Sequence, residues 1–301
     1  MQNKTVLVVG ATGFLGSETC RQLLQAGYNV KGLVRTSSNA EKVQALKDMG
    51  VETVTGDLKN RESLTTPLKG VEVIISTASS TLSRQAGDSI ESVDLQGQLN
   101  AIDAAEQAGV RKFVYVSFNS INQEFPLQTA KRKVEDRLQQ SSLDYTILQP
   151  TVFMEVWLSP ALGFDPNNAT ATIYGDGKNP ISWISLRDVA AFAVSSVHNE
   201  KAGKKTFELG GPDQLAPLEV VSLFEKESGR KFTVNHVPVE ALKQQKEAAT
   251  DSLSESFAGL MLGYAEGNRI PMNAVLRIFP VSLTSVKEYA HTITSAIEEV
   301  H

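Results

Sequence analysis

Cysteine, histidine and long apolar runs are scarce in this 301-residue chain. Its single cysteine, Cys20, excludes an intramolecular disulfide and any four-cysteine zinc site. The four histidines, His198, His236, His291 and His301, lack the spacing of metal ligands, so no metal site is expected. No run reaches the ~18 apolar residues of a membrane span, and the N-terminal apolar stretch is too short for a signal peptide. A cytoplasmic protein without membrane insertion is therefore expected.

A strong charge of one sign is also absent. The chain carries 29 lysines and arginines against 34 aspartates and glutamates, a formal net charge of -5. Because no global basic field exists to attract phosphates, a nucleic-acid partner is disfavoured. Apolar residues make up 41% of the chain, which is enough for a folded core. A small-molecule substrate is the expected partner.

Short β-branched runs alternate with longer amphipathic stretches along the first half of the chain. This pattern is typical of a parallel sheet covered by helices on both faces. We expect strands at 5–9, 29–34, 51–55, 71–76, 112–117 and 144–149. We expect helices at 14–25, 40–49, 60–68, 90–108 and 127–140, the first four each followed by glycine. The pattern predicts a doubly wound α/β fold.

A glycine-rich loop stands where the first predicted strand ends and the first helix begins. Glycines at such a place allow a tight turn and the close approach of a pyrophosphate, and the helix N-terminus presents free N–H groups. Strand, glycines, helix and second strand occur in the required order, which makes a mere tight turn the weaker alternative. The residues assigned to phosphate binding are Gly10, Thr12, Gly13, Phe14, Leu15 and Gly16.

The spacing Gly-x-x-Gly-x-x-Gly resembles that of the extended and atypical short-chain dehydrogenases/reductases, which have a Rossmann fold. Further motifs resemble their NmrA-like family, namely Leu33-Val34-Arg35, Gly56-Asp57, the run 104–117 and Tyr145-Thr-Ile-Leu-Gln-Pro150. The resemblance covers about residues 4–211, and the remainder matches loosely. Many such proteins dimerise through the helices expected at 90–108 and 127–140, although monomers occur as well. A monomer or a homodimer is therefore expected.

The alternation of strands and helices becomes irregular after Pro150, where further prolines interrupt it. Segments 181–198 and 206–210 look like a return to the sheet, and helical stretches predominate from 217 onward. We therefore expect an NADP-binding Rossmann domain formed by 1–155 with returning elements near 181–211. A smaller, mainly helical substrate-binding subdomain would consist of 156–180 and 212–301.

The end of the second predicted strand indicates which nucleotide binds. NAD enzymes usually place an acidic residue there for the ribose 2′-hydroxyl, whereas a 2′-phosphate needs a cation. Here Arg35 and Thr36 follow the strand, and no carboxylate occurs before Glu41. Because arginine binds phosphate in a bidentate manner, NADP(H) is the expected cofactor, with a solvated surface arginine as the alternative.

The resemblance implies further contacts with the nucleotide. Asp57 and Leu58 would line the adenine pocket, although Asp57 also fits an N-cap of the following helix. Three residues after the fourth strand would pass beside the adenosine and pyrophosphate, namely Ser76, Thr77 and Ala78. The backbone of a later segment would face the nicotinamide, namely Pro150, Thr151, Val152 and Phe153.

The resemblance also implies catalysis by a Tyr-x-x-x-Lys pair, in which lysine lowers the pKa of the tyrosine and holds the nicotinamide ribose. Lys131 takes the lysine position, but the tyrosine position is Leu127, which cannot transfer a proton. Asp94 stands where many relatives have asparagine, a second departure. Ser117 matches the position of the catalytic serine or threonine. The alternatives are a solvated lysine in the basic run 131–133 and a strand-end serine cap.

Phe153, Met154 and Trp157 would form an apolar wall for a flat substrate ring, with an ordinary helix-face core as the alternative. These features predict an NADPH-dependent oxidoreductase acting on a small apolar electrophile such as a quinone or an enone. A quinone takes its protons from solvent, which makes the missing tyrosine less damaging. Leu127 and Asp94 favour the alternative, a non-catalytic NADP(H)-sensing protein. A nucleotide-sugar epimerase or dehydratase is disfavoured because it would need the tyrosine.

Overall fold

The computed structural model describes residues 4–82 and 85–298, which form two compact units. The first unit is bounded by the ranges Met1–Phe118, Pro126–Gln149 and Val189–Phe207. The second unit is bounded by Asn119–Phe125, Pro150–Asp188 and Glu208–His301. The predicted assignment of 1–155 and 181–211 to NADP and of 156–180 and 212–301 to substrate stays a prediction.

A seven-stranded sheet in the order β3-β2-β1-β4-β5-β6-β9 confirms the predicted doubly wound α/β fold. Every neighbouring pair from β3 to β6 is parallel. Because β2 and β4 lie on opposite sides of β1, the winding reverses at β1, which is where such sheets bind ligands. The strands are β1 (Thr5–Val9), β2 (Asn29–Val34), β3 (Glu52–Thr55), β4 (Val73–Ser76), β5 (Lys112–Val116), β6 (Asp144–Pro150) and β9 (Lys205–Leu209).

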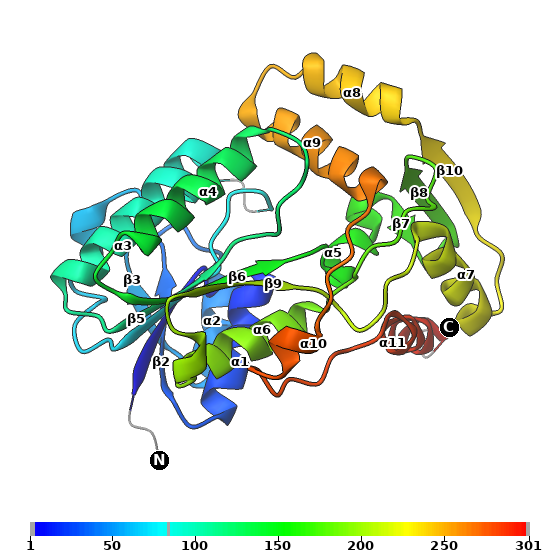
Figure 1. Cartoon of the computed structure of the whole chain (residues 1–301). Coiled ribbons are helices and arrows are strands. Elements are labelled where there is room, and N and C mark those ends of the chain that lie inside the picture. The colour runs from blue at the N-terminus through cyan, green and yellow to red at the C-terminus, as the bar shows by residue number, and fades with distance from the viewer. Residues whose placement is uncertain (1–3, 83–84, 299–301) are drawn as a thin grey trace. The chain divides into compact units, whose positions relative to one another are not determined.

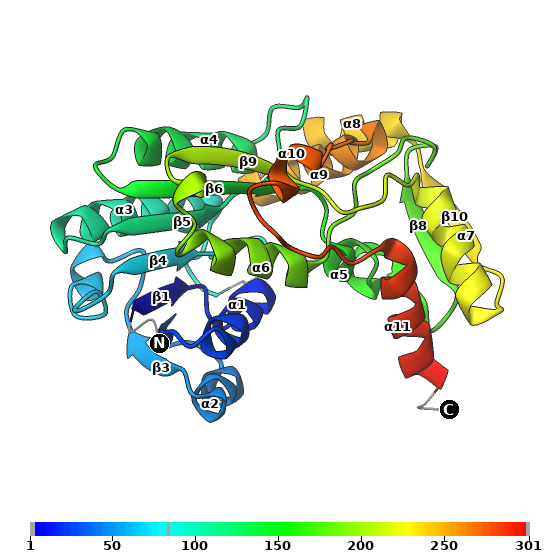
Figure 2. The ribbon, with the colours of Figure 1, turned by 60° about the horizontal axis from the view of Figure 1, so that its bottom comes forward.

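Helices cover both faces of this sheet, with α1, α2 and α6 on one face and α3 and α4 on the other (Figures 1 and 2). Their bounds are α1 (Phe14–Gln25), α2 (Ala40–Met49), α3 (Gln98–Gln107), α4 (Pro126–Gln139) and α6 (Leu186–Ser196). The predicted stop of α2 is confirmed, because Gly50 follows it with a φ of 99°, in the left-handed region that glycine favours. Cys20 is wholly buried in α1, and burial raises the pKa of its thiol to about 12.

The α-helix predicted at 60–68 is wrong, because the structure has only a short 3₁₀ helix, η1 (Arg61–Leu64), within this segment. The Asn60 side chain accepts a hydrogen bond from the Glu62 N–H and so caps η1. Pro67 then donates no N–H and disfavours helical backbone before it, which prevents continuation. The helix predicted at 90–108 begins with a π-helical segment, η2 (Ile90–Gly97), and continues as α3.

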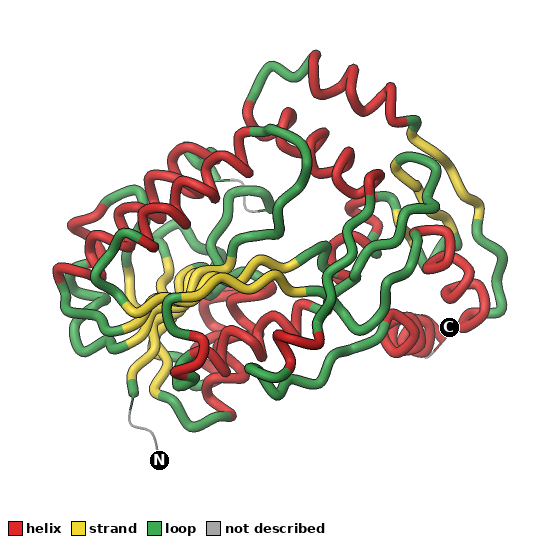
Figure 3. The backbone as a smooth tube through the Cα atoms, viewed as in Figure 1, coloured by secondary structure: helices red, strands yellow, loops and turns green. Residues whose placement is uncertain are grey.

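The second unit contains most of the remaining helices and a small sheet that the sequence did not predict (Figure 3). The sheet has the order β10-β8-β7, in which β8 pairs parallel to β10 and antiparallel to β7. Trp183, Phe224 and Met154 belong to its apolar core and are fully buried. The elements are α5 (Met154–Trp157), η3 (Pro160–Leu162), β7 (Phe164–Asp165), β8 (Thr170–Tyr174), η4 (Glu200–Ala202, in the first unit), α7 (Pro217–Ser228), β10 (Thr233–Val237), α8 (Val239–Glu247), α9 (Ser252–Glu266), α10 (Asn273–Leu276) and α11 (Val286–Glu298).

Two expected absences concern the described part of the chain. Within residues 4–82 and 85–298, no helix combines the length and apolar content required to cross a membrane. The same residues contain no cluster of three or more histidine, cysteine, aspartate or glutamate side chains placed to hold a metal ion.

Candidate functional site

The glycine loop between β1 and α1 is packed so tightly that side chains are excluded from it. A Cβ atom on Gly16 would lie 2.1 Å from the carbonyl oxygen of Gly10. Gly10 has a φ of 84°, and a Cβ there would lie 2.9 Å from the Ala78 nitrogen. The first turn of α1 therefore packs directly against the loop, and the loop against the segment that leaves β4. This is the cradle that the predicted pyrophosphate site requires.

The N-terminus of α1 has no side chain that would compete with an anion. Its N-cap is Gly13, no side chain caps it, and no acidic residue occurs in the first turn. The free N–H groups and the helix dipole favour a negatively charged group at this point. Leu15 is buried beneath the loop, Thr12 is half-buried, and Phe14 is 69% exposed.

The residues after β4 lie against the end of β1. The Thr77 backbone N–H and hydroxyl both donate to the Val9 carbonyl, at 2.9 and 3.0 Å. The side chain of Ser76 points into the interior and donates to Gln98 Oε1 at 2.8 Å. Gln98 in turn donates to the Ala78 carbonyl at 3.0 Å. Ser76, Thr77 and Ala78 are thus held beside the glycine loop, and their contact with a nucleotide stays a prediction.

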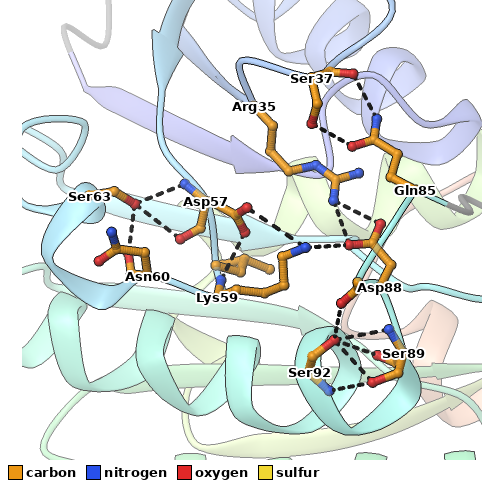
Figure 4. A network of polar contacts seen from close by, with 12 residues as sticks. Arg35, Ser37, Asp57, Lys59, Asn60, Ser63, Gln85, Asp88, Ser89 and Ser92 are labelled. Carbon is orange, nitrogen blue, oxygen red and sulfur yellow. Dashed lines mark hydrogen bonds and ion pairs between the residues drawn. The ribbon is translucent and has the colours of Figure 1, made fainter.

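At the end of β2, Arg35 belongs to a network of charged side chains from three separate segments (Figure 4). Its Nη1 donates to both carboxylate oxygens of Asp88 at 2.8 Å. Lys59, two residues after Asp57, donates to Asp88 Oδ1 at the same distance. The alternative of a solvated surface arginine is therefore wrong, because Arg35 is paired with Asp88. Thr36, the next residue, is exposed, and the nucleotide contacts of Arg35 and Thr36 stay predictions.

Asp57 and Leu58 follow β3, as the adenine-pocket prediction requires, and that role stays a prediction. Asp57 accepts a hydrogen bond from the Lys59 N–H at 2.9 Å, whereas the N-cap of η1 is Asn60. The alternative in which Asp57 caps the following helix is therefore wrong, because the cap lies three residues later, at Asn60. Leu58 is 7% exposed.

Sequence reasoning missed Lys59 and Asp88. Lys59 had a usable signal, because it lies just beyond the end of a parallel strand, where ligand-binding residues gather. Asp88 had none, since it follows no strand and is 53 positions from Arg35. Burial raises the pKa of the Asp88 carboxyl, but the hydrogen bonds and positive charges of Arg35 and Lys59 outweigh it and hold the pKa below its usual value.

Lys131 on α4 lies in a buried pocket of polar groups in the first unit. Its side chain is 6% exposed, and its Nζ lies 3.8 Å from Asp94 Oδ1 and 5.2 Å from the centre of the Tyr115 ring. The solvated alternative for Lys131 is therefore wrong. Burial lowers the pKa of Lys131, and the negative charges of Asp94 and Glu135 oppose this effect.

Asp94 is held from the other side by the segment after β4. Its Oδ2 accepts hydrogen bonds from the Ser80 N–H and hydroxyl at 2.9 and 2.6 Å. Asp94 Oδ1 and Ser117 Oγ have no hydrogen-bond partner among the described residues. Ser117 therefore does not act as a side-chain cap of β5, and its catalytic role stays a prediction. Leu127, at the tyrosine position, is 3% exposed.

The residues predicted to face the nicotinamide and substrate lie in the second unit. The Thr151 hydroxyl donates to the Ser182 carbonyl, and Phe153 forms a backbone bridge with Ile184. Met154 is fully buried, which favours its core alternative. Pro150 is buried and Val152 is half-buried.

Trp157 stacks on Tyr264, with ring centres 4.9 Å apart and planes inclined by 12°. Trp157 and Phe153 are half-buried, so both keep part of their surface accessible in this unit. The substrate roles of Phe153, Met154 and Trp157 stay predictions.

Comparison with known proteins places this geometry in a family. The model of the NmrA-like family matches residues 2–290. The Photosystem II assembly factor Ycf39 of Synechocystis is 34% identical over 79% of this chain and 72% of its own length. An NAD(P)H azoreductase of Xenophilus azovorans is 31% identical over 85% of this chain and 84% of its own.

Solved structures share the fold at lower identity. An isoflavone reductase is 22% identical with a TM-score of 0.78, over 97% of this chain and all of that one. The NADPH complex of a quinone oxidoreductase from Escherichia coli is 22% identical with a TM-score of 0.76, over 96% of this chain and 99% of that one. The predicted resemblance is thus confirmed, and the chain belongs to the NmrA-like family.

Proposed function

We propose that this chain binds NADP(H) in its first unit and reduces a small apolar electrophile, such as a quinone or an enone. The observation that carries the proposal is the side-chain-free cradle at Gly10 and Gly16 over the uncapped N-terminus of α1. Arg35 and Lys59 add two cations just beyond the ends of β2 and β3, where a bound dinucleotide would have its adenosine ribose. The azoreductase relative and the NADPH-bound quinone oxidoreductase neighbour agree with this function.

The chemistry that the chain itself contributes is limited, because Leu127 cannot donate a proton. When bound, NADPH would supply the hydride. Lys131 would orient the nicotinamide ribose, and its lowered pKa suits it to release a proton from Nζ through water. A quinone that accepts the hydride needs one further proton, which solvent can supply, so it demands the least from these residues.

Titration with NADPH, NADH, NADP+ and NAD+, followed by a quinone and enone panel, tests the proposal. We expect the 2′-phosphorylated forms to bind more tightly, and NADPH oxidation to accelerate with at least one panel member. The absence of any dinucleotide binding would overturn the proposal. Binding without acceleration by any acceptor would overturn its catalytic part.

Lys131→Ala is expected to lower the quinone-dependent rate by about 100-fold, because loss of the side chain that orients the ribose would misplace the nicotinamide by about 1 Å. It should also weaken NADPH binding, since Lys131 holds the ribose. Lys133→Ala is the matched control, because Lys133 is exposed on the same helix. Steady-state kinetics of both variants measure the effect, and equal rates in the two would contradict the role of Lys131.

A second candidate function is NADP(H)-dependent binding of another protein without turnover. Leu127 and the enclosure of Lys131 favour it, and several relatives at 32 to 34% identity are Photosystem II assembly factors. Hydrogen exchange of the protein with NADPH and with NADP+ distinguishes the candidates. A sensor requires protection that differs between the two forms, together with no acceleration in the acceptor panel.

A further inference from the structure

The segment between β4 and η2 contacts the loop after β2 through two side chains. Asp88 accepts two hydrogen bonds from Arg35 Nη1, at 2.8 Å each, and a third from Lys59 Nζ. Gln85 accepts a hydrogen bond from the Ser37 hydroxyl at 2.6 Å and donates to the Ser37 carbonyl at 2.9 Å. Arg35 Nη1 and Lys59 Nζ thus already have an acceptor within the chain, whereas Arg35 Nε and Nη2 donate to none of the described residues (Figure 4).

The charges of this network cancel. Arg35 and Lys59 contribute two positive charges, and Asp88 and Asp57 contribute two negative charges, with Asp57 4.0 Å from the Lys59 ammonium. The Asp88 side chain is 2% exposed, whereas those of Arg35 and Lys59 are 24% and 28% exposed. Solvent therefore screens the Asp88 carboxylate less than the cations that it neutralises.

A phosphate monoester carries about -1.5 to -2 charges at pH 7 and needs donors of the same kind. A phosphate bound at Arg35 and Lys59 would compete with Asp88 for Nη1 and Nζ, and it would lie close to the Asp88 carboxylate, whose like charge repels it. We propose that Asp88 competes with the 2′-phosphate of NADP(H) for Arg35 and Lys59. Asp88 thereby sets the selectivity between NADP(H) and NAD(H). This inference rests on the dinucleotide binding proposed above.

Asp88→Asn removes the competing charge and keeps the size of the side chain. We expect NADPH and 2′,5′-ADP to bind about tenfold more tightly than to the unmodified chain, the effect of one like charge at close range. NADH and 5′-ADP lack the 2′-phosphate, so their affinities should change by less than about twofold. Isothermal titration calorimetry with the four ligands measures the gain in affinity and shows whether it is confined to the two ligands with a 2′-phosphate.

Asp103→Asn is the matched control. Asp103 also pairs with two arginines, Arg137 at 2.7 Å and Arg61 at 3.4 Å, but has no contact with Arg35 or Lys59. The control removes the same charge from the same unit, and it should leave the ratio of NADPH to NADH affinity unchanged. Asp88→Ser is the second neutral variant, which keeps the test valid if the asparagine variant folds poorly.

The outcomes separate this inference from the proposed function. If the unmodified chain prefers NADPH and both Asp88 variants bind it equally well or more weakly, Asp88 is not a competitor, while the proposed function stands. An equal gain in affinity for NADH would also overturn the inference. So would a similar change in the ratio of NADPH to NADH affinity in Asp103→Asn. If no variant with a native circular dichroism spectrum binds any dinucleotide, the inference and the proposed function fall together.

Discussion

Gly16→Ala is expected to weaken dinucleotide binding by about 100-fold or more. The new Cβ would lie 2.1 Å from the Gly10 carbonyl oxygen, so the loop or the start of α1 must move. Movement misplaces the backbone N–H groups that would hold the pyrophosphate. Each hydrogen bond to a charged group contributes about 1.5 to 3 kcal/mol, and the loss of one or two corresponds to about 100-fold in affinity. Fluorescence titration with NADPH measures the loss.

Gly27→Ala provides the matched control for Gly16→Ala. Gly27 follows α1 with a φ of 80° and open space around its Cβ position, so alanine there strains the backbone by about 1 to 2 kcal/mol without steric overlap. Overpacking at Gly16 costs a similar amount, about 1 to 3 kcal/mol. Both variants should therefore lose stability in thermal unfolding, but Gly27→Ala should bind NADPH normally. A similar affinity in both variants would show that the loop does not hold the nucleotide.

Asp94→Ala is expected to lower the free energy of unfolding by about 3 kcal/mol. Both Asp94 and Lys131 are buried, and removal of Asp94 takes from Lys131 the carboxylate with which it forms its ion pair. The Ser80 N–H and hydroxyl lose their acceptor as well. Urea unfolding of Asp94→Ala measures the change. Asp94→Leu combined with Lys131→Met should recover most of the loss, because apolar replacements of a buried pair are often neutral.

The pH dependence of this loss has a definite sign. Burial lowers the pKa of Lys131 below the 10.5 of an exposed lysine, so the native state binds fewer protons than the unfolded chain between these two pKa values. Native stability therefore gains from this lysine as pH rises through that window. Removal of Asp94 lowers the pKa of Lys131 further. Toward pH 10 Lys131 is increasingly neutral in both native proteins, so the difference in free energy of unfolding between Asp94→Ala and the unmodified chain should become smaller. An equal or larger difference at pH 10 would contradict the buried pair as the cause.

Local signals predicted much of the first unit well. The bounds of β1, β2, α1 and α2 agree with the sequence prediction, because hydrophobic period and glycine stops act over a few neighbouring residues. The prediction of a helix at 60–68 was wrong because Pro67 lies within this segment and disfavours helical backbone before it. The sheet of β7, β8 and β10 escaped prediction because its strands have two to five residues, and β10 pairs with β8 from more than sixty positions away.

The sequence by itself determined that a glycine loop joins a buried strand to a helix and that Arg35 follows the next strand. It also determined that no tyrosine stands four residues before Lys131. Only the tertiary structure decided that Asp88 pairs with Arg35 and that Asp94 encloses Lys131. The physical reason is distance along the chain. Propensity and spacing act between neighbours, whereas the partner of a charged side chain depends on which distant segments the packed sheet brings together.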